Sequence, residues 1–187
     1  MKLEGDEQCN QDTRDFRCYD DHDEECCQYA KSSNCAWAKI AGGPLAPAIK
    51  GRVFFEETSC GVVVSVEICG LPPYQPAQGE RQPIGPHGFH LHENGNCNIG
   101  DPKEPFSGAG GHWNPTNQPH GNHVGDFPVL FSNHGVAKMS FFTDKFRVKD
   151  IIGRALIIHQ NPDDYRSQPA GNSGKRLACG IIRWCHC

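Results

Sequence analysis

Short stretches in which hydrophobic and polar residues alternate recur along most of this chain. The clearest is Gly61–Cys69, where every second residue from Val62 to Ile68 is a branched aliphatic residue. Because successive side chains of a β-strand point to opposite faces, this alternation predicts a half-buried strand. Similar runs rich in β-forming residues predict further strands at residues 49–57, 129–131, 136–142, 151–159 and 180–184.

The segments between these runs are rich in proline and glycine, and residues 71–86 are expected to form a long loop. No segment has the periodicity of an amphipathic helix. Several short strands with turn-rich connections predict an all-β fold, an antiparallel Greek-key barrel or sandwich. The chain has 187 residues, of which 37% are hydrophobic, and this is enough for one compact domain with a tail.

The N-terminal end differs in composition from the rest. Residues 1–27 contain ten acidic and three basic residues, a net charge of −7, whereas the whole chain carries −4. A strongly acidic segment with few aliphatic side chains cannot bury much surface. We therefore expect a loosely ordered, cysteine-rich N-terminal segment, residues 1–35, ahead of a folded domain, residues 36–187.

The chain has 11 cysteines, five of them in this N-terminal segment. Because the number is odd, at least one thiol is unpaired within the chain or bonded to another molecule. The dense spacing is compatible with a disulfide-stapled module or an intermolecular crosslinking arm. It is also compatible with a soft-metal site, whose candidate ligands are Cys18, His22, Cys26, Cys27 and the tail Cys185, His186 and Cys187.

Indications of the compartment are mixed, and some partners are excluded. The first residues turn acidic where a signal peptide has its apolar core, which slightly favours the cytoplasm. The cysteine content instead favours an oxidising compartment outside the cytoplasm.

No apolar run reaches the length of a membrane span, and no basic stripe predicts nucleic-acid binding.

The stretch from Gly85 to Asp126 contains six of the ten histidines. Within it, the run 89–92 alternates apolar residues with His90 and His92, so on a strand both imidazoles lie on one face. His159 ends the apolar run 155–159, at a place where a distant ligand could join them. Clustered histidines of this kind are typical of metal sites.

A second group lies in loop-like sequence, and it consists of His112, His120, His123 and Asp126. Only two residues separate His120 from His123, and we expect a turn there to bring both imidazoles to one ion. Imidazoles suit copper and zinc, whereas magnesium and calcium need more oxygen ligands. Three of the other histidines, His22, His87 and His134, are interpreted as surface or loop residues.

Four segments together carry a resemblance to a known family. They are GFHLH, GAGGHWNPTNQPHGNHVGD, the run that ends in His159, and GNSGKRLACGII near the C-terminus. In this order, from about Ala36 to Trp184, the chain resembles the copper/zinc superoxide dismutases. The resemblance implies an eight-stranded antiparallel Greek-key barrel or sandwich with long metal-binding and electrostatic loops.

The resemblance also implies roles for particular residues. Asp163 matches the carboxylate that links the two metal sites, and Arg176 the arginine beside the copper. Cys97 and Cys179 match the family's intramolecular disulfide. The implied copper ligands are His90, His92, His112 and His159, and the implied zinc ligands are His112, His120, His123 and Asp126.

The reaction implied by the resemblance converts two superoxide anions to dioxygen and hydrogen peroxide, with His112 as the imidazole shared between copper and zinc. Arg176 would bind the anionic substrate, because a guanidinium stays charged at every relevant pH. Two other functions stay open: a non-catalytic copper- and zinc-binding module, and a structural protein crosslinked through its cysteine-rich ends. A homodimer or a disulfide-linked assembly is compatible with each of them.

Overall fold

The computed structural model describes residues 34–185 with the exception of residue 82. The expected N-terminal segment therefore lies almost wholly outside the described residues, as do His22 and the end of the cysteine-containing tail. Within the described part, the chain forms eight strands and two single-turn helices. The strands are β1 (Cys35–Gly42), β2 (Lys50–Glu57), β3 (Val62–Cys69), β4 (Phe89–His92), β5 (Ala137–Thr143), β6 (Ala155–His159), β7 (Arg176–Ile181) and β8 (Arg183–Trp184).

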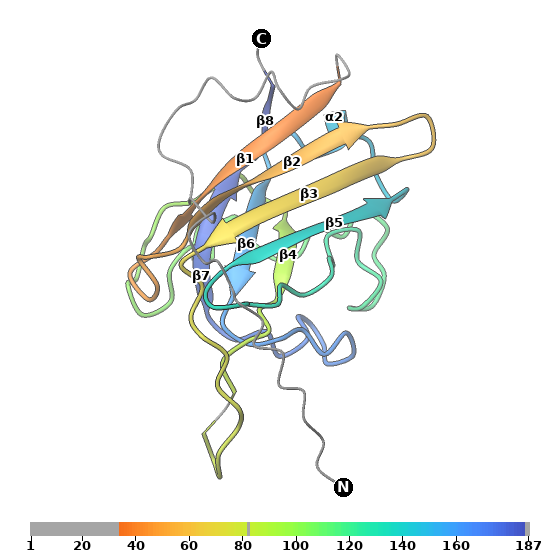
Figure 1. Ribbon diagram of the computed structural model, residues 1–187. Helices are drawn as coiled ribbons and strands as arrows, with labels where there is room; N and C mark the ends of the chain where they lie inside the picture. Colours follow the sequence, from red (N-terminus) through yellow and green to blue (C-terminus); the bar gives the residue numbers. More distant parts are fainter. Residues whose placement is uncertain (1–33, 82, 186–187) are drawn as a thin grey trace, which may run out of the picture.

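All strand pairs are antiparallel, and the strands form one curled sheet in the order β4-β6-β7-β1-β2-β3-β5, with β8 paired to β1. The first three strands form a meander, and the chain then crosses to the far edge of the sheet to form β4. In Figure 1, β1, β2, β3 and β5 lie in the front layer, with β4, β6 and β7 behind them. The predicted all-β class and antiparallel barrel are confirmed.

The alternation seen in the sequence places the core between these two layers. In β3 the side chains of Val62, Val64, Val66 and Ile68 are buried while their neighbours are half exposed, as the pattern predicts. Phe55 of β2 and Leu156 of β6 enter the same core from other strands. Burying these aliphatic and aromatic side chains is the main contribution to stability.

Three predicted element boundaries are wrong. Residues 129–131 are not a strand, because there only Leu130 is bridged to other backbone, at His87. Residues 151–154 are not strand either, because the single-turn helix α2 (Val148–Ile151) ends there. At the residue before α2, the Arg147 N–H donates to Asp150 Oδ2 at 2.9 Å. The pattern of apolar residues that predicted a strand does not reveal this local bond. Strand β7 begins at Arg176, four residues before the predicted start at residue 180.

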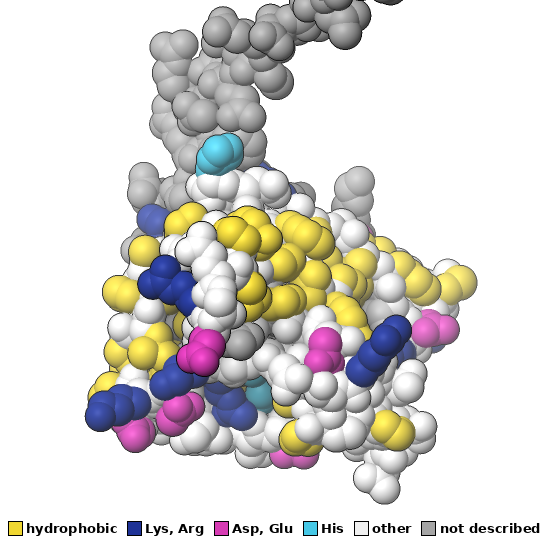
Figure 2. All heavy atoms as spheres, turned by 90° about the horizontal axis from the view of Figure 1, so that it is seen from below, with side chains coloured by type: hydrophobic (Ala, Val, Ile, Leu, Met, Phe, Trp, Pro, Cys, Tyr) yellow, Lys and Arg dark blue, Asp and Glu magenta, His cyan; other side chains and the backbone are white. Residues whose placement is uncertain are grey.

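The lower end of the barrel in Figure 1 consists largely of loops. Seen from below, hydrophobic side chains gather in the middle of this end, with charged side chains around them (Figure 2). Part of this end is a shallow hollow lined by Leu45, Pro47, Leu71, Pro72 and Val136. Among the described residues, no helix is long and apolar enough to cross a membrane.

Candidate metal centre

Strand β4 carries two histidines into the interior. Phe89 and Leu91 belong to the hydrophobic core, and His90 and His92 are buried on the other side of the strand, as predicted. On one edge, β4 pairs with β6, and the His159 N–H at the end of β6 donates to Gly88 O at 2.8 Å. This pairing brings the His159 ring to β4, where its Nε2 lies 3.3 Å from Nε2 of His92.

The other edge of β4 is covered by the loop of residues 112–126. The Trp113 N–H donates to Leu91 O at 2.8 Å, and the Leu91 N–H donates to Gly125 O at 2.9 Å. Isolated bridges place His112 opposite His92 and Asp126 opposite His90. Backbone pairing, and not side-chain contact alone, therefore sets the position of the histidine that both groups share.

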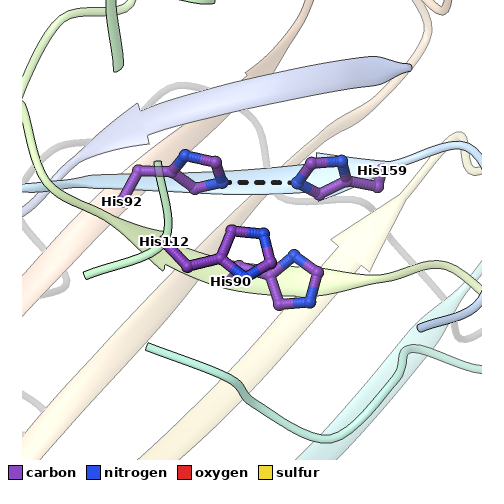
Figure 3. A group of neighbouring side chains, drawn as sticks. All are labelled: His90, His92, His112 and His159. Atoms are coloured by element: carbon purple, nitrogen blue, oxygen red, sulfur yellow. Dashed lines mark hydrogen bonds between the residues drawn. The ribbon is translucent and has the colours of Figure 1, made fainter. Parts of the chain in front are cut away.

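The first predicted group forms a compact cluster of buried imidazoles. The rings of His90 and His112 stack with centroids 3.8 Å apart. One ligand nitrogen from each member lies within 4.8 Å of those of the others. Figure 3 shows the four rings gathered between β4, β6 and the loop; they belong to His90, His92, His112 and His159.

The second predicted group is organised by Asp126. Its Oδ1 lies 2.8 Å from Nδ1 of His112 and 3.3 Å from Nδ1 of His123, and its Oδ2 lies 3.3 Å from Nδ1 of His120. Gly121 has a φ of 93°, and its N–H donates to Asp126 Oδ2 at 2.8 Å. The short turn thus brings both loop histidines to one point, as expected from the two-residue spacing.

Asp163 joins the two groups. Its Oδ2 lies 2.7 Å from Nε2 of His90, and its Oδ1 lies 2.8 Å from Nε2 of His120. The carboxylate is buried and both imidazoles donate to it. Each ring is thereby fixed in the tautomer whose Nδ1 carries the lone pair, the arrangement that carboxylates impose on metal-binding histidines.

Backbone carbonyls fix the other two rings of the first group. His92 Nδ1 donates to Gly110 O at 3.0 Å, and His159 Nδ1 donates to Gly174 O at 3.3 Å. These bonds leave Nε2 of both rings with its lone pair directed at the cluster. The outer hydrogen bonds therefore select the inward-facing nitrogen at every fixed histidine.

The inward-facing atoms are short of partners, which indicates that they fit metal ions. Buried polar atoms in proteins are almost always hydrogen-bonded. Among the described residues, the buried ring nitrogens that have no hydrogen bond include His90 Nδ1, His112 Nε2, His120 Nδ1 and His123 Nδ1. Four imidazoles suit copper, and three imidazoles with one carboxylate suit tetrahedral zinc.

Burial keeps the candidate ligands in the protonation states that metals require. Desolvation, with a smaller effect of His112, lowers the pKa of His90 to about 4. Desolvation likewise lowers the pKa of His92 and of His159 well below the usual value. Burial alone would raise the pKa of Asp126, but the bonds from His112 and the Gly121 N–H hold it well below the usual range. Neutral imidazoles and a charged carboxylate are the binding forms.

Arg176 lies at the start of β7, next to the first group. Its Nη1 donates to Phe106 O and its Nη2 donates to Gly110 O at 2.6 Å. Gly110 O is also the acceptor for His92, so Arg176 and His92 are fixed through one carbonyl. Burial lowers the pKa of Arg176 somewhat, and Glu104 opposes this; a guanidinium remains charged throughout.

A disulfide and a buried histidine complete the surroundings of the centre. The predicted disulfide is confirmed: Cys97 bonds to Cys179 and ties the loop after β4 to β7. His87 lies outside the named strands, but its interpretation as a surface residue is wrong, because its side chain is fully buried and its Nδ1 donates to His159 O at 2.9 Å. Its position three residues before His90 was the only available signal. His134 is exposed, as expected.

Comparison with known proteins decides the family. A model of the copper/zinc superoxide dismutase (SODC) family matches residues 49–182. The chain belongs to this family. A Cu-Zn superoxide dismutase of Deinococcus radiodurans is 34% identical over 152 residues, 72% of this chain and 78% of the relative. One from Aquifex aeolicus is 38% identical over 149 residues, 71% of this chain and 78% of the relative.

Solved structures agree with these relatives. The Cu/Zn superoxide dismutase from Brucella abortus aligns with a TM-score of 0.63 and 31% identity, over 79% of this chain and 98% of that one. A double mutant of a SOD-like protein from Bacillus subtilis aligns with a TM-score of 0.63 and 29% identity, over 79% and 96%. As a copper/zinc superoxide dismutase, the chain is an oxidoreductase, and copper and zinc are its metals.

Proposed function

We propose that this superoxide dismutase binds copper through the first group and zinc through the second, and that it converts two superoxide anions to dioxygen and hydrogen peroxide there. One observation carries the proposal: buried imidazole nitrogens without a hydrogen bond face both positions, while the outer nitrogens are fixed by other partners. Copper supplies the one-electron exchange with superoxide, and zinc is redox-silent.

His112 has a nitrogen in each group. Its Nδ1 faces Asp126, and its Nε2 is buried without a hydrogen bond among the described residues. An imidazole in this position can hold a proton at Nε2 whenever that nitrogen is not bound to metal. We assign to His112 both the bridge between the groups and the delivery of a proton to the reduced oxygen species.

Arg176 positions the substrate. Its two carbonyl bonds hold the guanidinium against the loop of residues 106–110, beside the His92 ring. A fixed positive charge next to the first group attracts a small anion and orients it. Asp163 and the backbone acceptors hold the imidazoles in place, so the residues that touch substrate are Arg176 and the histidines of the first group.

The test is superoxide decay measured by stopped flow. Protein loaded with one copper and one zinc should accelerate decay, and metal-free protein should not. His159→Gln should abolish the acceleration, whereas the matched control His134→Gln, at an exposed histidine, should retain it. Equal decay with loaded wild type and loaded His159→Gln would overturn the assignment of the first group.

The oligomeric state stays a prediction. Size-exclusion chromatography with and without reductant should separate a homodimer held by surface contacts from an assembly held by disulfides. A dimer that persists in reductant is of the first kind, and one that dissociates is of the second.

A further inference from the structure

The outer face of the front layer, formed by β1, β2, β3 and β5, carries a row of charged side chains. The registers place Lys39, Arg52, Glu67 and Lys138 side by side across the four strands. Lys138 Nζ forms an ion pair with Glu67 Oε1 at 3.1 Å. In the next row Lys50 lies opposite Cys69. The two rows together have four cations and one carboxylate, so this half of the face attracts anions.

The other half of the same face carries aromatic side chains, with the polar residues Ser65, Ser140 and Glu56 in the same rows. Trp37 of β1 lies opposite Phe54 of β2, and both are half-buried although they point away from the core. In the row beyond them Phe142 of β5 lies opposite Val63 and is 55% exposed. A solvated sheet face is normally polar. Adjoining aromatic and cationic rows are instead typical of a surface that binds a partner.

One segment of the chain has the charge, the length and the attachment point of such a partner. Residues 1–33 lead directly into β1, the strand that contributes Trp37 and Lys39 to this face. Residues 1–27 carry a net charge of −7, opposite in sign to the cationic rows. An extended segment of this length spans roughly 100 Å, far more than the width of about 15 Å across four strands.

Cys69 gives an independent indication that the N-terminal segment is this partner. It ends β3 in the row of Lys50, and it is disulfide-bonded. None of the other cysteines that the structure describes is its partner, since Cys97 bonds to Cys179 and the remainder are not bonded to Cys69. The N-terminal segment offers four further cysteines, Cys9, Cys18, Cys26 and Cys27.

We propose that the outer face of β1, β2, β3 and β5 is the docking surface for the chain's own acidic N-terminal segment, residues 1–33, and that a disulfide from Cys69 to a cysteine of this segment fastens it there. In the proposed arrangement the acidic side chains of the segment face the cationic rows, and its aromatic residues face Trp37, Phe54 and Phe142. Closing the bond removes two protons and two electrons from two thiols, and one hydrogen peroxide takes them up to give two waters.

The first test maps disulfides and crosslinks in the full-length protein. The protein is crosslinked with a carbodiimide, which joins lysines to adjacent carboxylates, and the monomer band of a non-reducing gel is digested for mass spectrometry. We expect Cys69 joined to a peptide from residues 1–33, and Lys39, Lys50 or Lys138 joined to acidic residues 1–27. Lys149, exposed and in α2 instead of the sheet, is the control and should give no such crosslink.

Three results would overturn the proposal. In the first, Cys69 is joined to Cys187. In the second, its disulfide occurs only in a dimer band, which would make a second copy the occupant. In the third, Lys149 is crosslinked to the acidic segment as often as the lysines of the outer face, which would mean that the segment has no preferred surface.

A charge-reversal variant tests the electrostatic part. Lys39→Glu/Lys138→Glu should reduce the crosslinks between Lys50 and residues 1–27 by roughly five-fold or more, because like charges repel at contact distance. Lys149→Glu should leave them unchanged. Neither variant changes a residue of the metal centre, so superoxide decay should be normal in both. The docking proposal and the proposed function can therefore fail independently of each other. Unchanged crosslinking in the double variant would refute docking by charge.

Discussion

Arg176 donates a hydrogen bond from Nη2 to the carbonyl oxygen of Gly110 at 2.6 Å. The same carbonyl accepts the Nδ1–H of His92, so the residue proposed to attract substrate and a proposed copper ligand are fixed by one backbone atom. A change at Arg176 therefore acts on the charge beside the copper position and on the loop that orients His92.

Arg176→Ala is expected to lower kcat/KM for superoxide by about ten-fold or more, because the local positive potential that steers the anion is lost. Arg176→Lys should fall between this variant and wild type, since lysine keeps the charge but not the paired donors. Stopped-flow rates at several salt concentrations provide the measurement. A variant with wild-type rate and wild-type salt dependence would exclude this role for Arg176.

His159→Gln should separate the two metal positions. His159 belongs to the first group and makes no contribution to the second, so the variant is expected to lose copper and retain about one zinc per chain. Turnover should fall by about 100-fold or more, since even residues that only support metal ligands cost 10- to 100-fold. Elemental analysis after dialysis gives both contents. Loss of zinc together with copper would show that the groups are not independent.

Asp163→Asn should weaken metal binding without removing any ligand. The carboxylate accepts from Nε2 of both His90 and His120, and an amide can accept only through its oxygen while its NH2 group opposes the second ring. We expect the affinity for zinc to fall by about 10- to 100-fold. Competition with a chromophoric chelator measures it, and Asp164→Asn, at an exposed neighbour, is the matched control that should leave the affinity unchanged.

The disulfide between Cys97 and Cys179 spans 82 residues. Removing it with Cys97→Ser/Cys179→Ser should lower the free energy of unfolding by about 4 kcal/mol, because the unfolded chain regains the freedom that the crosslink removed. Urea unfolding of the metal-free protein measures the difference. A change below about 1 kcal/mol would show that other contacts already hold the loop after β4.

His87→Leu tests the buried histidine that supports β6. Its Nδ1 bond to the His159 carbonyl would be lost, leaving a buried acceptor unsatisfied at a cost of about 1–3 kcal/mol. Thermal unfolding of the metal-free protein should show a lower midpoint. His134→Asn, at an exposed position whose φ of 52° an asparagine tolerates, should stay within about 0.5 kcal/mol of wild type, and equal effects of the two substitutions would contradict the role of His87.

Alternation along the chain is a local property, and where it is regular the strand that it predicts is found. It placed His90 and His92 on one side of β4 and Val62 to Ile68 of β3 in the core. The burial of His87 and the single turn of α2 could not be read in this way, since both depend on bonds to residues that the pattern does not connect. His87 is buried because β6 supplies the acceptor for its ring, 72 positions away in the sequence.

The candidate site was likewise only partly predictable from the sequence. Spacing indicated that His120 and His123 reach one ion, and the Gly121 turn accounts for it. The sequence could not show that the loop of residues 112–126 pairs with the edge of β4, because register between distant segments is set by packing. That pairing is what brings His112 opposite His92.

The attachment of the histidines to different parts of the fold has a consequence for how the protein opens. His90, His92 and His159 sit on paired strands, whose amides exchange with solvent only when the sheet itself separates, whereas His120 and His123 sit on a loop held by turns. We therefore expect thermal fluctuations of the metal-free protein to loosen the second group before the first. Three of the four nitrogens of the first group are in place as soon as the barrel has folded, so the fold itself builds most of the proposed copper position, whereas the proposed zinc position needs its ion to complete it.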